Sequence, residues 1–215
     1  MNKKFLVQII ALLLVSTSLS YMFVETDVYE ETYSRIVSVI CLSCIKLNRI
    51  YSADYQFDTA NGKMHPDFII EDLKEGPVFL SFRTDVCEYC DDMEPLIMEI
   101  FNISFEKEDV FSEPLYFNDE KISFYHINKD HANQDLKTLQ PFYDIDGDNA
   151  VPMFTIITLG YDKGIIKPQF ITFYGILEIT YTDEQRIDEI TNHVVDSLKL
   201  YSENRPGFIP EEFKK

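Results

Sequence analysis

The sequence contains no tryptophan and few basic residues. Only 19 of its 215 residues are Lys or Arg, against 37 Asp or Glu, so the formal net charge at pH 7 is −18. Such an acidic chain repels the phosphate backbone of nucleic acids and the headgroups of anionic lipids. We therefore expect neither a nucleic-acid partner nor electrostatic docking on a membrane, and we attribute the charge to solubility.

Histidine and cysteine are scarce, with four of each, and their placement argues against several cofactors. The cysteines form two CxxC pairs. Neither pair is followed by the His that covalent haem attachment requires, because Ile45 and Asp91 occupy those positions. No histidine stands at metal-ligand spacing from either pair. The two pairs could together bind structural zinc, but the 42 residues between them exceed the usual spacing of such sites, and the strand–helix setting of the second pair suits redox chemistry better. Residues 144–148 resemble a calcium loop, but Thr155 replaces the bidentate Glu of an EF-hand, so the sequence predicts no metal and no cofactor.

The length and the 46% hydrophobic content are typical of one globular domain with attached segments. No internal repeat is present apart from the two cysteine pairs. We divide the chain into an N-terminal targeting segment (1–24), a helical or extended segment with the first cysteine pair (25–64), one α/β domain (65–202) and a C-terminal tail (203–215).

Residues 1–24 have the pattern of a signal anchor or a signal peptide. Lys3 and Lys4 precede an apolar run, and no charged residue follows until Glu25. The uncharged stretch is long enough to span a bilayer as a helix, although its most apolar part, 5–15, is as short as a signal-peptide core. An uncleaved anchor is our first interpretation, a cleaved signal the second and a buried core helix the third. The lysines favour an N-terminus inside and a domain on the extracytoplasmic side, or secreted, where disulfides persist.

A second CxxC pair, Cys41 and Cys44, falls on a helix predicted over residues 33–47. This helix is too short to cross a membrane, so we expect it to pack on the domain or to lie near the bilayer surface. Two interpretations of the pair stay open: two small buried packing residues, or an accessory dithiol that exchanges with the other pair or with a membrane partner. Residues 51–64 predict an edge strand or a hairpin.

The most informative motif is the CxxC at residues 87–90. An apolar run over 77–82 predicts a buried strand before it, and apolar residues at helical spacing over 91–101 predict a helix after it. The first sulfur therefore stands at a helix N-terminus, where unpaired backbone N–H groups and the helix dipole stabilise a thiolate. Cys87 is thus the predicted nucleophile that attacks disulfides, and Cys90, one turn on, is the predicted resolving thiol.

Two further features make the chain resemble the thioredoxin superfamily. Pro95 follows the CxxC at the offset where thioredoxins carry the proline that kinks the active-site helix. Val151-Pro152 opens an apolar strand after residues 142–150, which are similar to the loop before the family's cis-proline. The resemblance covers roughly residues 65–202. It implies a thioredoxin-like three-layer α/β/α sandwich with a mixed central sheet, preceded by the N-terminal hydrophobic helix.

The thioredoxin-like order of elements gives explicit boundaries. The predicted elements are helices over 66–74, 88–102, 131–143 and from Thr182 onward, and strands over 78–82, 122–127, 153–159 and 169–174. Thr182 and Gln185 form a capping box at the start of the last helix. Residues 103–120 are predicted to be a surface insertion.

The resemblance also implies how substrates bind. A cis-Pro152 would lie against the cysteine pair and leave the backbone of Val151 free to hydrogen-bond an extended substrate chain. Tyr89, between the two cysteines, offers that chain an aromatic surface. The sequence departs from the family at Ser81, which stands in place of the usual buried acid, and at Arg83, which replaces a tryptophan, as Val86 also does.

Two functions remain open at this point. The first is a thiol–disulfide oxidoreductase, anchored in a membrane or exported, that acts on cysteine-containing proteins and is recharged by a redox partner. The alternative is a redox-inert thioredoxin-like binding module in which Cys87 and Cys90 form a permanent structural disulfide. The direction of electron flow is undecided, because Arg83 favours a thiolate whereas acidic residues around the motif disfavour it.

Overall fold

The structure is a computed structural model that describes residues 55–205. Within this range, residues 55–162 and 166–205 belong to one compact unit. The predicted targeting segment at 1–24 and the Cys41–Cys44 pair lie outside the described residues, so both stay predictions. Among the helices of residues 55–205, none is long and apolar enough to cross a membrane.

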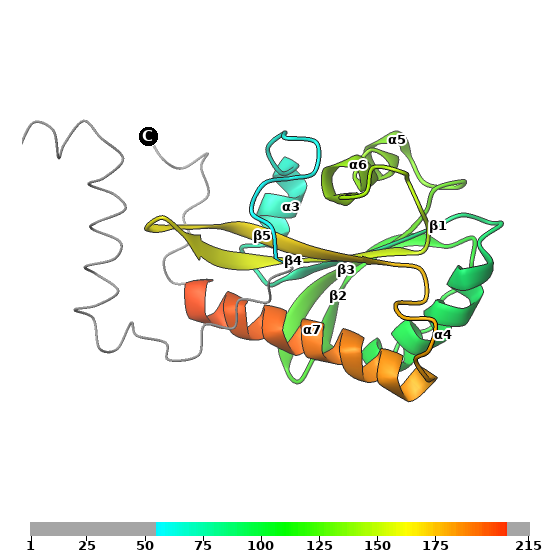
Figure 1. The fold of residues 1–215 in the computed structure, drawn as a ribbon. Coiled ribbons are helices and arrows are strands. Elements are labelled where there is room, and N and C mark those ends of the chain that lie inside the picture. The colour runs from blue at the N-terminus through cyan, green and yellow to red at the C-terminus, as the bar shows by residue number, and fades with distance from the viewer. Residues whose placement is uncertain (1–54, 206–215) are drawn as a thin grey trace, which may run out of the picture. The chain divides into compact units, whose positions relative to one another are not determined.

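A five-stranded mixed sheet forms the centre of this unit, in the order β2-β3-β1-β4-β5 (Figure 1). The central strand β1 (Val78–Arg83) is parallel to β3 (Glu120–Asn128) and antiparallel to β4 (Met153–Asp162). The edges are β2 (Val110–Phe117), which is antiparallel to β3, and β5 (Ile165–Tyr174). The predicted α/β class with a mixed sheet is confirmed.

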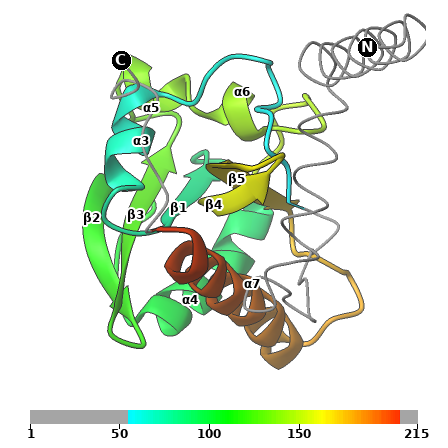
Figure 2. The same cartoon turned by 90° about the vertical axis from the view of Figure 1, so that its left-hand side faces the viewer.

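Helices cover both faces of the sheet (Figure 2). On one face lie α3 (Asp67–Asp72), α5 (Gln134–Lys137) and α6 (Gln140–Tyr143), and on the other lie α4 (Glu88–Phe101) and α7 (Asp183–Asn204). Every residue of β1 is buried, because the alternating side chains of a strand point into both helical layers. Each face has its own apolar core, so the sheet lies in the middle of three layers.

Several predicted elements agree with the structure. The predicted strands 78–82 and 122–127 correspond to β1 and β3, and the predicted helix 88–102 corresponds to α4. The capping box at the start of α7 is present, with both reciprocal hydrogen bonds between Thr182 and Gln185. These elements were predictable because each carries its own local signal.

Three predictions were wrong in part. Residues 103–120 contain the edge strand β2, whose Glu113 and Pro114 suit a strand with one free edge. The single helix predicted over 131–143 is two short helices, since Asn133 caps α5 and Pro141 stands in the first turn of α6. Residues 55–64 form no strand, only one bridge from Gln56 to β5.

Candidate functional site

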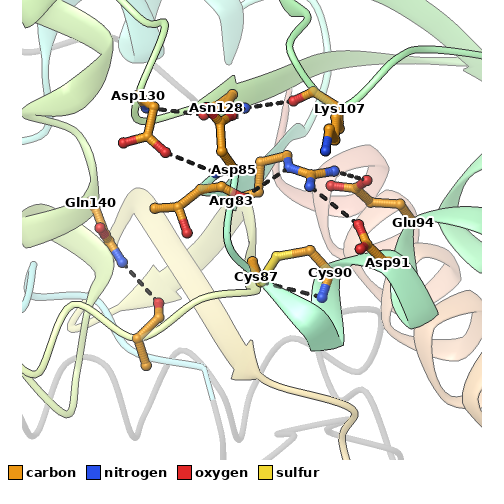
Figure 3. The surroundings of a disulfide bond; sticks show 12 residues. Arg83, Asp85, Cys87, Cys90, Asp91, Glu94, Lys107, Asn128, Asp130 and Gln140 are labelled. Carbon is orange, nitrogen blue, oxygen red and sulfur yellow. Dashed lines mark hydrogen bonds and ion pairs between the residues drawn. A yellow bond between two sulfur atoms is a disulfide. The ribbon is translucent and has the colours of Figure 1, made fainter.

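The CxxC motif lies where the central strand β1 meets the helix α4. Cys87 is the N-cap of α4 in an extended backbone conformation, and its sulfur accepts a hydrogen bond from the backbone N–H of Cys90 at 3.2 Å. The two Cα atoms are 5.2 Å apart and the sulfurs are at disulfide distance (Figure 3). The predicted position of the first sulfur at a helix N-terminus is therefore confirmed.

The two sulfurs differ in exposure, but both lie below the surface. Cys87 is 6% exposed and Cys90 is fully buried, so their order agrees with the prediction while Cys87 is less open than expected. Large side chains beside the pair are exposed: Val86 almost completely, and Tyr89 by 51%. An incoming chain would meet these apolar side chains first.

The Val151–Pro152 peptide bond is cis, as predicted. Phe82 at the end of β1 is in register with Met153 at the start of the antiparallel β4, so Pro152 lies at the same end of these two strands as the CxxC. Pro152 is buried and its carbonyl accepts a hydrogen bond from Gly175 at 2.9 Å, whereas within residues 55–205 the Val151 backbone makes no hydrogen bond. The predicted contact between Pro152 and the sulfurs stays a prediction.

The loop before Pro152 is held from within the protein. The buried Gln140 donates from Nε2 to the carbonyl of Ala150 at 2.9 Å. The Asp144 carboxylate is buried and accepts hydrogen bonds from the backbone of Gly147 and Asn149 at 3.1 and 2.7 Å, so it fixes the turn. In the described part of the chain, no three His, Cys, Asp or Glu side chains are grouped to hold a metal ion.

A hydrogen-bond network fixes the short loop between β1 and Cys87. The Asp85 carboxylate accepts from Asn128 Nδ2 at 2.8 Å and contacts His131 Nε2 at 3.0 Å, while the Asp85 backbone N–H donates to Asp130 at 2.7 Å. The hydrogen bond from Asn128 is the main cause that lowers the pKa of Asp85. Since Asn128 ends β3 in register with Arg83, the ends of two parallel strands position this loop.

Three charged residues, Arg83, Asp91 and Glu94, form a cluster of ion pairs near the CxxC motif (Figure 3). The fully buried Arg83 donates to the carboxylate of Glu94 and pairs with Asp91 at 3.3 Å. The Glu94 side chain is buried and its Oε1 atom has no hydrogen-bond partner, whereas the Asp91 side chain is 68% exposed. Burial raises the pKa of Glu94 to about 7, although the Arg83 charge acts to lower it.

His126 completes the buried polar group next to Arg83. Its ring is fully buried on β3, 4.1 Å from the Phe105 ring and 5.7 Å from the Phe111 ring between centroids. Neither ring nitrogen has a hydrogen-bond partner. Burial, followed by the charge of Arg83, lowers the pKa of His126 to about 4. This histidine is therefore neutral at pH 7 and adds no second positive charge.

Glu94 is a site residue that was not predicted from the sequence. A signal was available, since Glu94 follows Cys90 by one helical turn and falls in the apolar stripe of α4 with Met93 and Ile97. A carboxylate in that stripe must be buried when the stripe faces the sheet. Arg83 was named as a group that stabilises a thiolate, but its pairing with Glu94 comes from the tertiary structure.

Comparisons with known proteins add no assignment to this site. No family model and no curated protein matches the sequence. The fold and the site define a mixed α/β domain with a CxxC pair at disulfide distance, at the N-terminus of the helix that follows the central strand.

Proposed function

We propose that this protein is a thioredoxin-like thiol–disulfide oxidoreductase that exchanges disulfides with cysteine-containing exported proteins. The observation that carries the proposal is the Cys87–Cys90 pair, at disulfide distance, at the N-terminus of α4. The order of elements from β1 to α7 and the position of Pro152 at the CxxC end of β1 and β4 support the thioredoxin-like assignment.

The two cysteines have different roles in the proposed reaction. The Cys87 thiolate attacks a substrate disulfide, which breaks that S–S bond and forms a mixed disulfide. Cys90 then attacks Cys87, so that the pair becomes oxidised and both substrate sulfurs leave reduced. The N–H groups at the start of α4 stabilise the Cys87 thiolate, and the acidic residues Glu88 and Asp91 in the same turn oppose it. The reverse sequence of steps oxidises a substrate dithiol.

The substrate is an extended chain that contains cysteine. Tyr89 and Val86 offer it exposed apolar surface, and the Val151 backbone offers it a hydrogen-bond donor and acceptor. A separate redox partner returns the Cys87–Cys90 pair to its starting state. No cofactor takes part in this scheme, since both electrons pass between sulfur atoms.

The cellular setting is part of the same proposal. We place the domain on the extracytoplasmic side of a membrane, held by the hydrophobic segment 1–24, or in secreted form. Cys41 and Cys44 would serve as an accessory dithiol between the partner and the site. Both assignments rest on the sequence, because these residues lie outside the described range.

A redox-inert binding module with a structural disulfide is the second candidate. The low exposure of both sulfurs favours it, because a protected disulfide resists attack by other thiols. In that case the exposed apolar side chains beside the pair would bind a partner without electron transfer. Reducibility separates the two candidates.

The proposed activity predicts that the full chain accelerates the reduction of insulin by dithiothreitol. Cys87 reacts with the insulin disulfides, and dithiothreitol regenerates the pair. The turbidity of precipitated insulin chains measures the rate, and the variant with both Cys41 and Cys44 replaced by Ser serves as a control that keeps the activity. A rate equal to that with dithiothreitol alone would favour the binding module.

A further inference from the structure

Cys90 needs a base that the two-cysteine scheme does not supply. Its sulfur must lose a proton before it attacks the mixed disulfide, because the thiolate is the nucleophile. Cys90 is fully buried, and burial in an apolar environment disfavours the thiolate. Ser81, at the position where the resemblance places an acid, has no acid–base chemistry near neutral pH.

Glu94 is the buried carboxylate that follows Cys90 by one turn of α4. Residues at i and i+4 lie on the same helix face with Cβ atoms about 5–6 Å apart. Cys90 and Glu94 have this spacing, and both belong to the buried face of α4. Arg83 donates a hydrogen bond to Oε2 of Glu94, whereas Oε1 is buried without a hydrogen-bond partner. An unpartnered buried carboxylate oxygen is costly, and Oε1 has the capacity to accept a proton.

We infer that Glu94 is the acid–base group of Cys90, accepting its proton when the mixed disulfide is resolved and returning it when the pair is reduced. The inference rests on the proposed redox function. In the resolving step, the proton passes from Cys90 to Glu94, a new S–S bond forms between Cys90 and Cys87, and the bond from Cys87 to the substrate breaks. The substrate sulfur leaves as a thiolate with the electron pair of that bond. Glu94 then releases the proton to solvent.

The electrostatic surroundings suit this exchange. The raised pKa of Glu94, about 7, is near the pH at which a general base works best. The charged groups that face Glu94 within residues 55–205 are Arg83 from β1, which lowers this pKa, and Asp91 from α4, which raises it. His126 from β3 lies beyond Arg83 and is neutral at pH 7.

The test separates the attack of Cys87 from the resolving step of Cys90. The full chain with Cys41 and Cys44 replaced by Ser is reduced and mixed with 5,5′-dithiobis(2-nitrobenzoic acid) in a stopped-flow instrument. Cys87 releases the first coloured aryl thiolate, and the attack of Cys90 releases the second. This leaving group departs as an anion at neutral pH, so the second phase reports the deprotonation of Cys90.

Glu94→Gln is expected to slow the second phase by roughly 100-fold at pH 7, because the general base is lost. The pH dependence of that phase should also move from the neutral range toward the alkaline range of an unassisted thiol. Glu94→Asp should restore part of the rate. The rate of the first phase should change by less than about threefold, because that phase depends on the Cys87 thiolate and not on a proton held by Glu94.

Asp91→Asn is the matched control, because Asp91 is a carboxylate on the same helix that pairs with the same arginine but is exposed. It should change the second phase by less than about threefold. The inference is overturned if Glu94→Gln and Glu94→Asp both keep the wild-type second phase, or if Asp91→Asn slows it equally. If the parent chain itself releases no thiolate, the proposed function fails as well. Circular dichroism checks that each variant is folded.

Discussion

Cys87→Ser is expected to abolish disulfide reduction, whereas Cys90→Ser should retain the first step and accumulate a mixed disulfide with the substrate. Cys87 is the N-cap of α4 and the more exposed sulfur, so it alone is placed to attack an incoming disulfide. Without Cys90, no thiol remains to release the substrate. Insulin reduction measures the loss of activity, and mass spectrometry of the non-reduced protein detects the adduct.

The contrast between the two variants is more informative than either loss alone. A structural disulfide would make both substitutions equivalent, with lower stability and no adduct. The Cys41→Ser/Cys44→Ser variant controls for adducts on the other pair. Equal reductase activity in both single variants and the wild type would refute the proposed roles.

Arg83→Met is expected to lower the free energy of unfolding by about 3–5 kcal/mol at pH 8, because it leaves the buried Glu94 carboxylate without its counter-charge. The loss should be smaller at pH 5. The unfolded chain releases the Glu94 proton above about pH 4.3, whereas the folded variant retains it, so stability falls as the pH rises. Urea unfolding at both pH values measures the effect.

Two further variants show whether this loss comes from the buried charge. Arg83→Met combined with Glu94→Leu should recover most of the stability at pH 8, because no uncompensated charge remains. Asp91→Asn removes only an exposed partner of Arg83 and should change the stability by less than about 1 kcal/mol. A loss of equal size at both pH values would show that packing of the arginine side chain, not charge, is responsible.

Local signals in the sequence were enough to predict the centre of the site. The apolar run of β1, the helical spacing of α4 and the CxxC between them predicted where Cys87 lies. The cis bond before Pro152 was implied by the resemblance of residues 142–152 to the loop before the family's cis-proline. These features depend on residues close together in the chain, which a single sequence contains in full.

The features that were missed depend on tertiary contacts. The edge strand β2 contains Pro114, which disfavours a strand by itself, so it becomes a strand only by pairing with β3. The pairing of Arg83 with Glu94 depends on α4 packing over the end of β1. The burial of His126 between Phe105 and Phe111 likewise depends on the sheet, since an isolated histidine carries no sign of its environment.

The reduction potential of the Cys87–Cys90 pair tests the central claim most directly. It is measured in glutathione or dithiothreitol redox buffers, with the full chain and with the Cys41→Ser/Cys44→Ser variant. A disulfide at the N-terminus of α4 that serves in exchange should have a potential between about −270 and −120 mV, the range of known oxidoreductases, and the value should be the same in both proteins. A potential below about −300 mV would mark a structural disulfide and contradict the proposed function.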